Sequence, residues 1–443
     1  MKRLLGEAGF FAYLDALNQP YTRALRVNLL LRPDGTPPCP IEGLGAPVPW
    51  AKGAYFVEGD ARPGLSPLHE GGLFYMQEPS ALTAVTALDP QPGERVLDLC
   101  AAPGGKSTQI AALMAGRGLL CCNEPIPSRA QILSRNIERM GVRNAVVLSA
   151  MPDALAPRFP AFFDRILVDA PCSGEGMFRR QPEARDEWDA DAPRRCADRQ
   201  MEILAQAAKM LRPGGTMVYS TCTFNDTENE GVLKRFLALH PEFSLVPFAL
   251  PGLPEAKDGY LHLYPHEMRG EGHFVSRLKK ADGADGADAP VQAAPQRKAP
   301  ARAAAKGKAP APIALPDVFS DAFAPERLYT AGDALWMLPE GISIERLSGL
   351  RVLRTGLLLA HAEGKRSEPD HALAMALRPE EAARTASLTQ TQALAYQAGE
   401  TLALGDLPGG YTLLCCEGVS LGWGKQAGGM MKNHYPKGLR RRN

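Results

Sequence analysis

Short apolar runs alternate with longer amphipathic stretches over residues 93–278. The runs typical of strands are RVLDL (95–99), GLLCCNE (118–124), AVVLSA (145–150), RILVDA (165–170) and TMVYST (216–221). The stretch at 128–140 is typical of a helix that ends at Gly141, and its apolar positions are Ile132, Leu133, Ile137 and Met140. Because strands alternate with helices, the pattern predicts an α/β fold built on a doubly wound, mostly parallel sheet.

Polar and thiol side chains follow these predicted strands at their carboxyl ends. They are Asp98, Cys100, Glu124, Asp169, Cys172, Thr221 and Cys222. In a doubly wound sheet the carboxyl ends of the strands meet at the edge where ligands bind. We therefore expect one site at that edge.

Composition divides the chain at residues 281–316, which are almost entirely Ala, Pro, Gly, Asp, Lys and Arg and predict a flexible linker. We predict an N-terminal segment at 1–75, a catalytic domain at 76–280 and small C-terminal α+β modules at 317–443. Strand-like runs in the last part, such as LRVLRTGLLLAH (350–361) and YTLLCC (411–416), suggest that its final module is a compact β-barrel.

Composition and charge exclude several classes of protein. The net charge is +1, so a polyanion must be bound by local basic patches. No apolar run approaches the roughly 20 residues of a membrane span, and the first 17 residues are typical of an amphipathic helix rather than a secretion signal. The nine cysteines include no C-x-x-C pair, which argues against a zinc ribbon or another metal site and against a disulfide framework. We expect a cytoplasmic protein with free, mostly buried thiols.

The glycine-bearing loop CAAPGGKS, at 100–107, allows three interpretations. A Walker A loop requires a glycine where Cys100 stands, and the dinucleotide spacing G-x-G-x-x-G is absent. S-adenosylmethionine needs a tight turn, which Gly104 and Gly105 provide, and an acid after the next strand, which Glu124 provides. The loop therefore favours a methyl donor, and Lys106 is either part of that site or the structural partner of an acid.

Asp169, Cys172 and Cys222 suit methylation of cytosine. Carbon 5 of cytosine is a poor nucleophile, and adding a thiolate to carbon 6 activates it. An acid near N3 assists that addition. From the chemistry alone, either cysteine is a candidate for the attack.

These motifs resemble those of the RNA cytosine-5 methyltransferases of the Nop/Sun type. The matching stretches are DLCAAPGGKST, NE, DAPCSGEG and STCTFNDTENE, together with RALRVNLL (23–30), FYMQEPSAL (74–82) and GEGHFVSRL (270–278). The resemblance covers about residues 1–280. Two tail motifs, SEPDHALAMAL (367–377) and GWGKQAGGMMKNHYPKGLR (422–440), are similar to bacterial members that act on small-subunit ribosomal RNA.

The resemblance implies a class I S-adenosylmethionine-dependent methyltransferase and a role for each site residue. It implies that Cys222 is the nucleophile, that Cys172 assists product release and that Asp169 contacts the target base, which agrees with the role of acid that the chemistry asks of Asp169. The residues implied to hold S-adenosylmethionine are Cys100, Ala101, Ala102, Pro103, Gly104, Gly105, Lys106, Glu124 and Asp169. The family usually has an acid just after the third strand for the adenine; here Asp153 comes late, and a contact near Met151 is the alternative.

The implied partner is ribosomal RNA or the small ribosomal subunit, bound by a monomer with no membrane association. The resemblance makes the N-terminal segment an RNA-contact module through Tyr21, Arg23, Arg26, Asn28 and Arg32; without it, these residues equally suit a solvated face. Residues 421–443 hold six Lys or Arg and no acid, interleaved with Trp423, His434 and Tyr435. Such a tail suits phosphates and unpaired bases, or else is a disordered basic tail.

Two other functions compete with methyl transfer. One is a catalytically idle RNA-binding factor for ribosome assembly, which would have no use for Asp169, Cys172 and Cys222. The other is a nucleotide hydrolase built on GGKS, which the missing first glycine disfavours.

Overall fold

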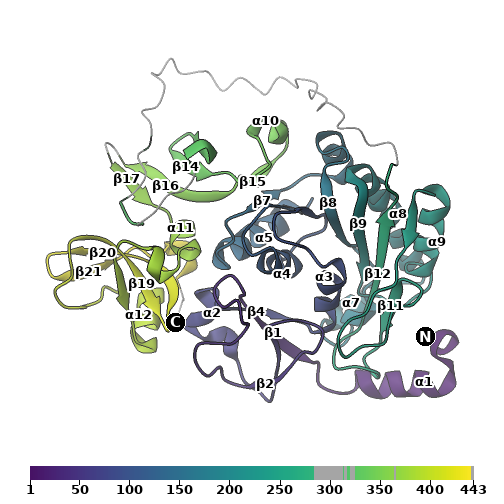
Figure 1. Cartoon of the computed structure of the whole chain (residues 1–443). Coiled ribbons are helices and arrows are strands. Elements are labelled where there is room, and N and C mark those ends of the chain that lie inside the picture. The colour runs from purple at the N-terminus through teal and green to yellow at the C-terminus, as the bar shows by residue number, and fades with distance from the viewer. Residues whose placement is uncertain (284–312, 314–316, 320–324, 364–365, 441–443) are drawn as a thin grey trace.

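The structure is a computed structural model, and it describes residues 1–283, 313, 317–319, 325–363 and 366–440 (Figure 1). The predicted linker at 281–316 therefore lies largely outside the described residues. No helix in the described part of the chain is long and apolar enough to cross a membrane.

A nine-stranded sheet forms the centre of the molecule. Its strand order is β10-β12-β9-β8-β5-β6-β7-β15, with β11 paired to β12. The five parallel strands are those predicted: β5 (Arg95–Asp98), β6 (Leu119–Asn123), β7 (Ala145–Leu148), β8 (Phe163–Asp169) and β9 (Leu211–Thr221). The antiparallel strands on the β9 side are β10 (Phe243–Leu245), β11 (Tyr260–Leu263) and β12 (His273–Lys280). The predicted α/β fold with a mostly parallel sheet is confirmed.

Helices cover both faces of this sheet, because alternate residues of each buried strand point to opposite sides (Figure 1). One face packs against α3 (Thr83–Leu88), α4 (Gly105–Leu113) and α5 (Pro127–Arg139). The other packs against α6 (Pro152–Leu155), α8 (Ala192–Met210) and α9 (Glu230–Leu239). The short α7 (Pro182–Asp186) lies in the connection from β8 to α8.

The predicted apolar face of α5 is correct except at one position. Leu133, Ile137 and Met140 are buried, but Ile132 is 49% exposed and the face is completed by Ala130. Spacings of three, four and three residues keep positions 130, 133, 137 and 140 on one stripe, and position 132 falls outside it.

The N-terminal segment forms a helix and a separate four-stranded sheet. Its elements are α1 (Lys2–Leu17), β1 (Arg23–Val27), β2 (Leu44–Pro47), β3 (Ala54–Val57), α2 (Pro67–Glu70) and β4 (Phe74–Gln77). The strand order is β2-β3-β1-β4. Strand β4 spans the predicted boundary between the N-terminal segment and the catalytic domain, at residues 75 and 76. The chain then continues into α3 of the catalytic part.

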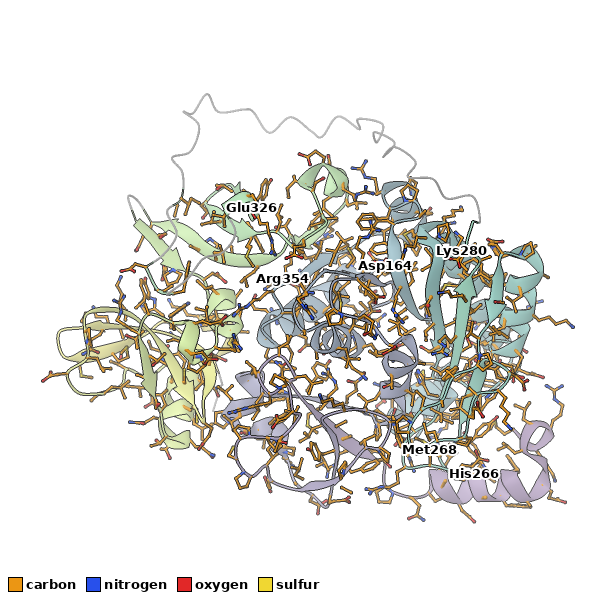
Figure 2. All side chains as sticks on the ribbon, in the orientation of Figure 1. Asp164, His266, Met268, Lys280, Glu326 and Arg354 are labelled. Atoms are coloured by element: carbon orange, nitrogen blue, oxygen red, sulfur yellow. The ribbon has the colours of Figure 1, made fainter. Side chains whose placement is uncertain are left out.

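The first C-terminal module adds a strand to the catalytic sheet. Its own sheet contains β13 (Leu328–Ala331), β14 (Ala334–Met337), β16 (Leu357–Glu363) and β17 (Arg366–Pro369), accompanied by α10 (Ile344–Leu347) and α11 (His371–Ala376). Strand β15 (Val352–Arg354) instead pairs antiparallel with β7. Arg354, labelled in Figure 2, is buried and pairs with Glu138 of α5 at 2.5 Å.

The second C-terminal module packs on the N-terminal sheet. It contains β18 (Thr385–Ser387), α12 (Gln390–Ala398), β19 (Gly410–Cys416), β20 (Val419–Ala427) and β21 (Met430–Asn433). Its strands pair in the order β18-β19-β20-β21, and among the described residues no pairing of β18 with β21 closes them into the predicted compact β-barrel. Leu421 and Tyr396 share one hydrophobic core with Leu25 and Phe74. The N-terminal sheet and the last module are therefore held together.

The predicted base-stacking role of the tail aromatics is wrong for two of them. Trp423 is 2% exposed and Tyr435 is 3% exposed. Trp423 Nε1 donates to the carbonyl of Asp370 at 2.8 Å, so this ring fills the core between the C-terminal modules. His434 pairs with Glu368 at 3.0 Å.

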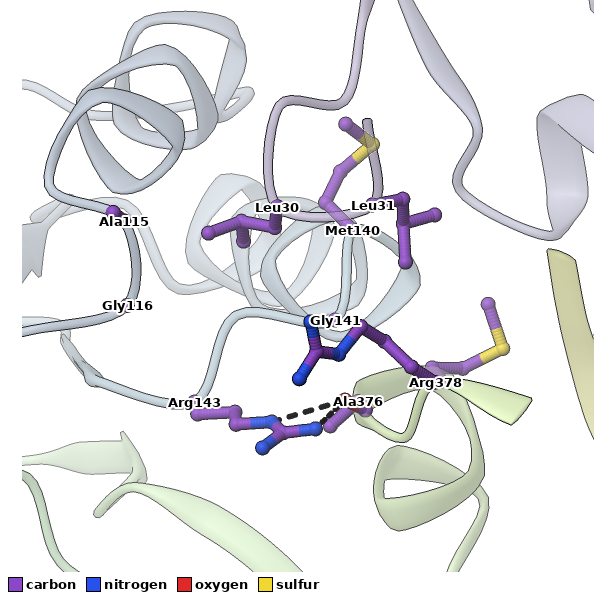
Figure 3. A pocket seen from close by; sticks show the side chains of 10 residues that line it. Leu30, Leu31, Ala115, Gly116, Met140, Gly141, Arg143, Ala376 and Arg378 are labelled. Atoms are coloured by element: carbon purple, nitrogen blue, oxygen red, sulfur yellow. Dashed lines mark hydrogen bonds between the residues drawn. The ribbon is translucent and has the colours of Figure 1, made fainter. Parts of the chain in front are cut away.

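A pocket lies at the junction of three parts of the chain (Figure 3). Leu30 comes from the N-terminal segment, Gly116 and Arg143 from the catalytic part, and Met375 from the C-terminal part. Arg143 donates from Nε to the carbonyl of Ala376 at 2.9 Å and forms an ion pair with Glu381. Its charge is therefore already neutralised within this junction. Gly116 and Arg143 precede β6 and β7, which places the pocket at the amino ends of the strands, away from the predicted site.

The stripe on α5 predicts a contrast between two neighbouring residues. Leu133→Ala should lower the free energy of unfolding by about 2–5 kcal/mol because it leaves a cavity in the core. Ile132→Ala should change it by less than about 1 kcal/mol, since this side chain is half exposed. Urea unfolding of both variants measures the difference; equal losses would contradict the assignment of the buried face.

Candidate active site

An ion pair joins the glycine-bearing loop to the end of β8. Lys106, in the first turn of α4, places Nζ 2.7 Å from Oδ2 of Asp169, the last residue of β8. Both groups lie at the carboxyl edge of the sheet, and the Lys106 side chain is 12% exposed. Of the two roles left open for Lys106, pairing with an acid is thus the one observed.

Further contacts keep Asp169 ionised. Ser220 Oγ donates to Asp169 Oδ1 at 2.8 Å, and Nε2 of His273 lies 3.4 Å from the same oxygen. Burial by itself raises the pKa of this carboxyl, but Lys106 and His273 together hold the pKa well below its usual range. A role for Asp169 as an acid therefore requires a proton from a neighbouring group.

The two candidate cysteines lie side by side. Cys172 follows β8 and Cys222 follows the adjacent parallel strand β9, and their Sγ atoms are 3.2 Å apart. The hydrogen bond with Cys222, burial and the nearby Glu228 raise the pKa of the Cys172 thiol. Cys222, by contrast, interacts electrostatically with the Lys106 ammonium. The Cys172 sulfur thus lies within electrostatic range of an acid, and the Cys222 sulfur within electrostatic range of a cation.

Glu228 fixes the loop that bears Cys172. Its fully buried carboxylate accepts hydrogen bonds from the backbone N–H of Ser173 at 3.1 Å, from Gln200 Nε2 at 2.7 Å and from Asn225 Nδ2 at 2.8 Å, and also from the Ser173 hydroxyl. The sequence analysis did not assign Glu228 a role. In the sequence, Glu228 is marked only by its position within the motif STCTFNDTENE.

Two residues expected to contact RNA are instead part of the scaffold. Arg26 is 1% exposed, and its Nη2 donates to Thr108 Oγ1 at 2.8 Å and to the carbonyl of Gly105 at 3.3 Å. Asn28 is equally buried and donates to the carbonyls of Gly72 and Met140. These polar side chains point into the junction between the N-terminal sheet and the catalytic part. In the sequence alone, polar residues at such a junction look the same as polar residues on a basic surface. Tyr21 remains 46% exposed.

The loop at 100–106 lies against α5 and β4. Gly104 has φ +112°, in the left-handed region that favours glycine, and a Cβ there would lie 3.2 Å from Leu133 Cδ1. Arg129 Nη2 donates to the carbonyl of Ala102 at 3.2 Å, and Arg129 Nη1 lies 3.4 Å from Glu124 Oε2. The structure therefore brings the predicted loop and the predicted acid together.

The carboxylates at this edge can accept hydrogen bonds from the free hydroxyls of a nucleoside. Glu124 is 2% exposed at the end of β6. Behind the loop, Asp98 Oδ2 accepts from Ser107 Oγ at 2.6 Å, and Asp98 Oδ1 has no hydrogen-bond partner among the described residues. Burial raises the pKa of the Cys100 thiol, and its side chain packs against the hydrophobic core on one face of the sheet.

Comparisons with known proteins match most of the chain. The profile described as N-terminal domain of 16S rRNA methyltransferase RsmF matches residues 1–79, and that of 16S rRNA methyltransferase RsmB/F matches 85–279. The RsmF rRNA methyltransferase first C-terminal domain matches 316–377, and the methyltransferase RsmF PUA domain matches 383–441. The solved methyltransferase homolog protein from Pyrococcus horikoshii is 30% identical with a TM-score of 0.51, over 63% of this chain and 97% of that one. NSun6 from the same organism, solved with SFG, is 22% identical with a TM-score of 0.54.

The sheet, its carboxyl edge and these matches define a methyltransferase of the class I fold. Proteins named ribosomal RNA small subunit methyltransferase F align along nearly the full length. That of Erwinia tasmaniensis is 33% identical over 99% of this chain and 95% of its own, and that of Escherichia coli O127:H6 is 34% identical over 97% and 92%. The chain belongs to this family, and it is a ribosomal RNA methyltransferase.

Asp98 gives the site a pH-dependent contribution to stability. Burial raises the pKa of this carboxyl from 3.8 to about 7. Between these values the folded protein keeps a proton that the unfolded chain has lost, so this group's contribution falls as the pH rises. The contribution is fully present below the unfolded pKa.

Asp98→Asn should remove this dependence while keeping a neutral partner for Ser107. The variant should gain stability relative to the wild type between about pH 4 and 7, by at most about 1.4 kcal/mol per pH unit. Urea unfolding of both proteins across pH 3–8 measures the difference. A difference that stays constant through this range would contradict the assignment.

Proposed function

We propose that this protein transfers a methyl group from S-adenosylmethionine to carbon 5 of cytosine in small-subunit ribosomal RNA. The supporting observation is the pair of thiols 3.2 Å apart beside the Lys106–Asp169 ion pair, at the carboxyl edge of the sheet. A methyl transfer to an oxygen or an exocyclic nitrogen needs no thiol, whereas cytosine carbon 5 requires a nucleophile at carbon 6. An RNA-binding assembly factor would require none of these groups.

In this proposal Cys222 attacks and Lys106 promotes the attack. A cation beside a thiol favours the thiolate. The Cys222 sulfur forms a bond to carbon 6, and the electron pair of the carbon 5–carbon 6 double bond shifts toward N3, which takes up a proton. Carbon 5 becomes the nucleophile that accepts the methyl group. Asp169 lies one strand away, where it would contact N3 and the exocyclic amine.

Cys172 assists the release of the product. After methylation, carbon 5 loses its proton to a base and the bond from Cys222 to carbon 6 breaks, which restores the double bond. The raised pKa of Cys172 keeps that thiol protonated, so that it can donate a hydrogen bond to the departing Cys222 sulfur.

S-adenosylmethionine supplies the methyl group when bound. Glu124 would accept hydrogen bonds from its ribose hydroxyls, and the loop at 100–106 would surround its methionine moiety, with Asp169 at the reacting end. The unpartnered Oδ1 of Asp98 is a further acceptor behind that loop.

The target cytosine must leave its stacked position to reach a buried edge. Because the N-terminal sheet and the last module pack together, the exposed cations Lys432 and Lys437 belong to the same unit as the exposed Tyr21. We assign RNA binding to this unit and catalysis to residues 76–280, while the predicted linker at 281–316 lies largely outside the described residues. We further propose that the protein acts as a monomer in the cytoplasm, the reducing compartment that nine free cysteines suit.

The nucleoside product distinguishes this function from other RNA methylations. Incubation of the protein with S-adenosylmethionine and small-subunit ribosomal RNA, both naked and as assembled subunits, followed by mass spectrometry of the nucleosides, should yield 5-methylcytidine. Cys222→Ser should lower that yield by at least about 10³-fold, because an alcohol replaces the nucleophile. A methyl group on ribose or on the exocyclic amine, or no methylation with either substrate, would contradict the proposal.

A further inference from the structure

His273 is a buried imidazole beside the candidate active site, and no step above uses it. It is the first residue of β12 and is 3% exposed. Its neighbour Phe274 pairs with Thr221 of β9, which brings His273 level with Cys222. Its Nε2 lies 3.4 Å from Asp169 Oδ1 and makes no hydrogen bond among the described residues. A buried polar nitrogen that lies near a carboxylate without completing a hydrogen bond lowers the stability of the folded protein. Its presence here therefore indicates a function.

The reaction needs a proton that Asp169 does not hold. N3 of cytosine takes up a proton when carbon 6 is attacked, but the carboxyl of Asp169 is ionised by its neighbours. Lys106 donates to Oδ2 at 2.7 Å and Ser220 to Oδ1 at 2.8 Å. Ser220 does not titrate, and a Lys106 that gave up its proton would leave Asp169 and Cys222 without their cation.

We propose that His273 is a positioning residue for Asp169 and holds the proton that Asp169 passes to N3. This inference rests on the proposed function. As Cys222 bonds to carbon 6, the proton on His273 Nε2 moves to Asp169 Oδ1, and the carboxyl so protonated gives its proton to N3. When Cys222 departs, N3 returns the proton by the same route. Asp169 and His273 therefore end the cycle in their starting protonation states, and the one proton released overall is that of carbon 5, which leaves to a base.

The surroundings of His273 restrict the exchange to Asp169. Cys222 follows β9 and Cys172 follows β8, and Lys106 binds the other carboxylate oxygen of Asp169, Oδ2. On the paired strand β11, Leu263 lies opposite His273, and the nearby His262 is bound to Glu230 at 2.6 Å. Glu271, two residues earlier on its own chain segment, is paired with Arg179 at 2.7 Å. Helix α3, which also packs on β12, contains no titratable side chain.

The pH dependence of the chemical step separates a proton-holding role from a merely structural one. Single-turnover methylation by the wild type should depend on pH with a bell shape, because the step needs both a deprotonated nucleophile and a protonated proton donor. His273→Gln keeps a donor toward Asp169 but does not titrate, so the alkaline fall should disappear and the maximal rate should drop by about 10²-fold. The KM for RNA should stay within about twofold, because the target base is still bound.

Ser220→Ala is the matched control, since it removes a donor to the same oxygen without removing a titrating group. It should lower the rate and keep the bell shape. His273→Asn serves for the same comparison if the Gln variant melts at a clearly lower temperature. A bell-shaped profile retained by the folded His273 variants would overturn the inference. If the wild type produced no 5-methylcytidine, the proposed function itself would fail, which the product analysis shows separately.

Discussion

The partly buried ion pair between Lys106 and Asp169 is the interaction on which the site depends. Two charges that are partly removed from water are stabilised when they are paired and hydrogen-bonded. The pair binds the first turn of α4 to the end of β8, and so fixes the loop at 100–106 relative to the two cysteines. It also keeps Asp169 ionised and places a cation beside Cys222. One contact thus sets the geometry and the charges of the edge.

The rest of the chain supports that edge from several directions. Arg26 reaches from the N-terminal sheet to hold the carbonyl of Gly105 and the hydroxyl of Thr108. Glu228 gathers three side-chain or backbone partners around the Cys172 loop. Strand β15 completes the far side of the sheet, and the last module shares its core with the N-terminal sheet. The modules that suit RNA are therefore built against the catalytic part.

Local pattern was sufficient to predict the parallel strands and the edge where Asp169, Cys172 and Cys222 meet, because strand order along the chain largely determines that edge. Local pattern failed where tertiary packing decides which residues are buried and which strands pair. Trp423 is buried although its segment is basic, and β15 joins a sheet more than 200 residues earlier in the chain. The contact between His273 and Asp169 joins residues more than 100 positions apart, and no local pattern reveals it.

The covalent intermediate offers the most direct test of the central claim, that Cys222 attacks and Cys172 releases. Ribosomal RNA and S-adenosylmethionine would be mixed with wild type, Cys172→Ala and Cys222→Ala, and a denaturing gel would report any protein–RNA adduct. The account predicts that an adduct accumulates only with Cys172→Ala, because attack and methylation proceed while release is blocked. An adduct that accumulates only with Cys222→Ala would contradict it.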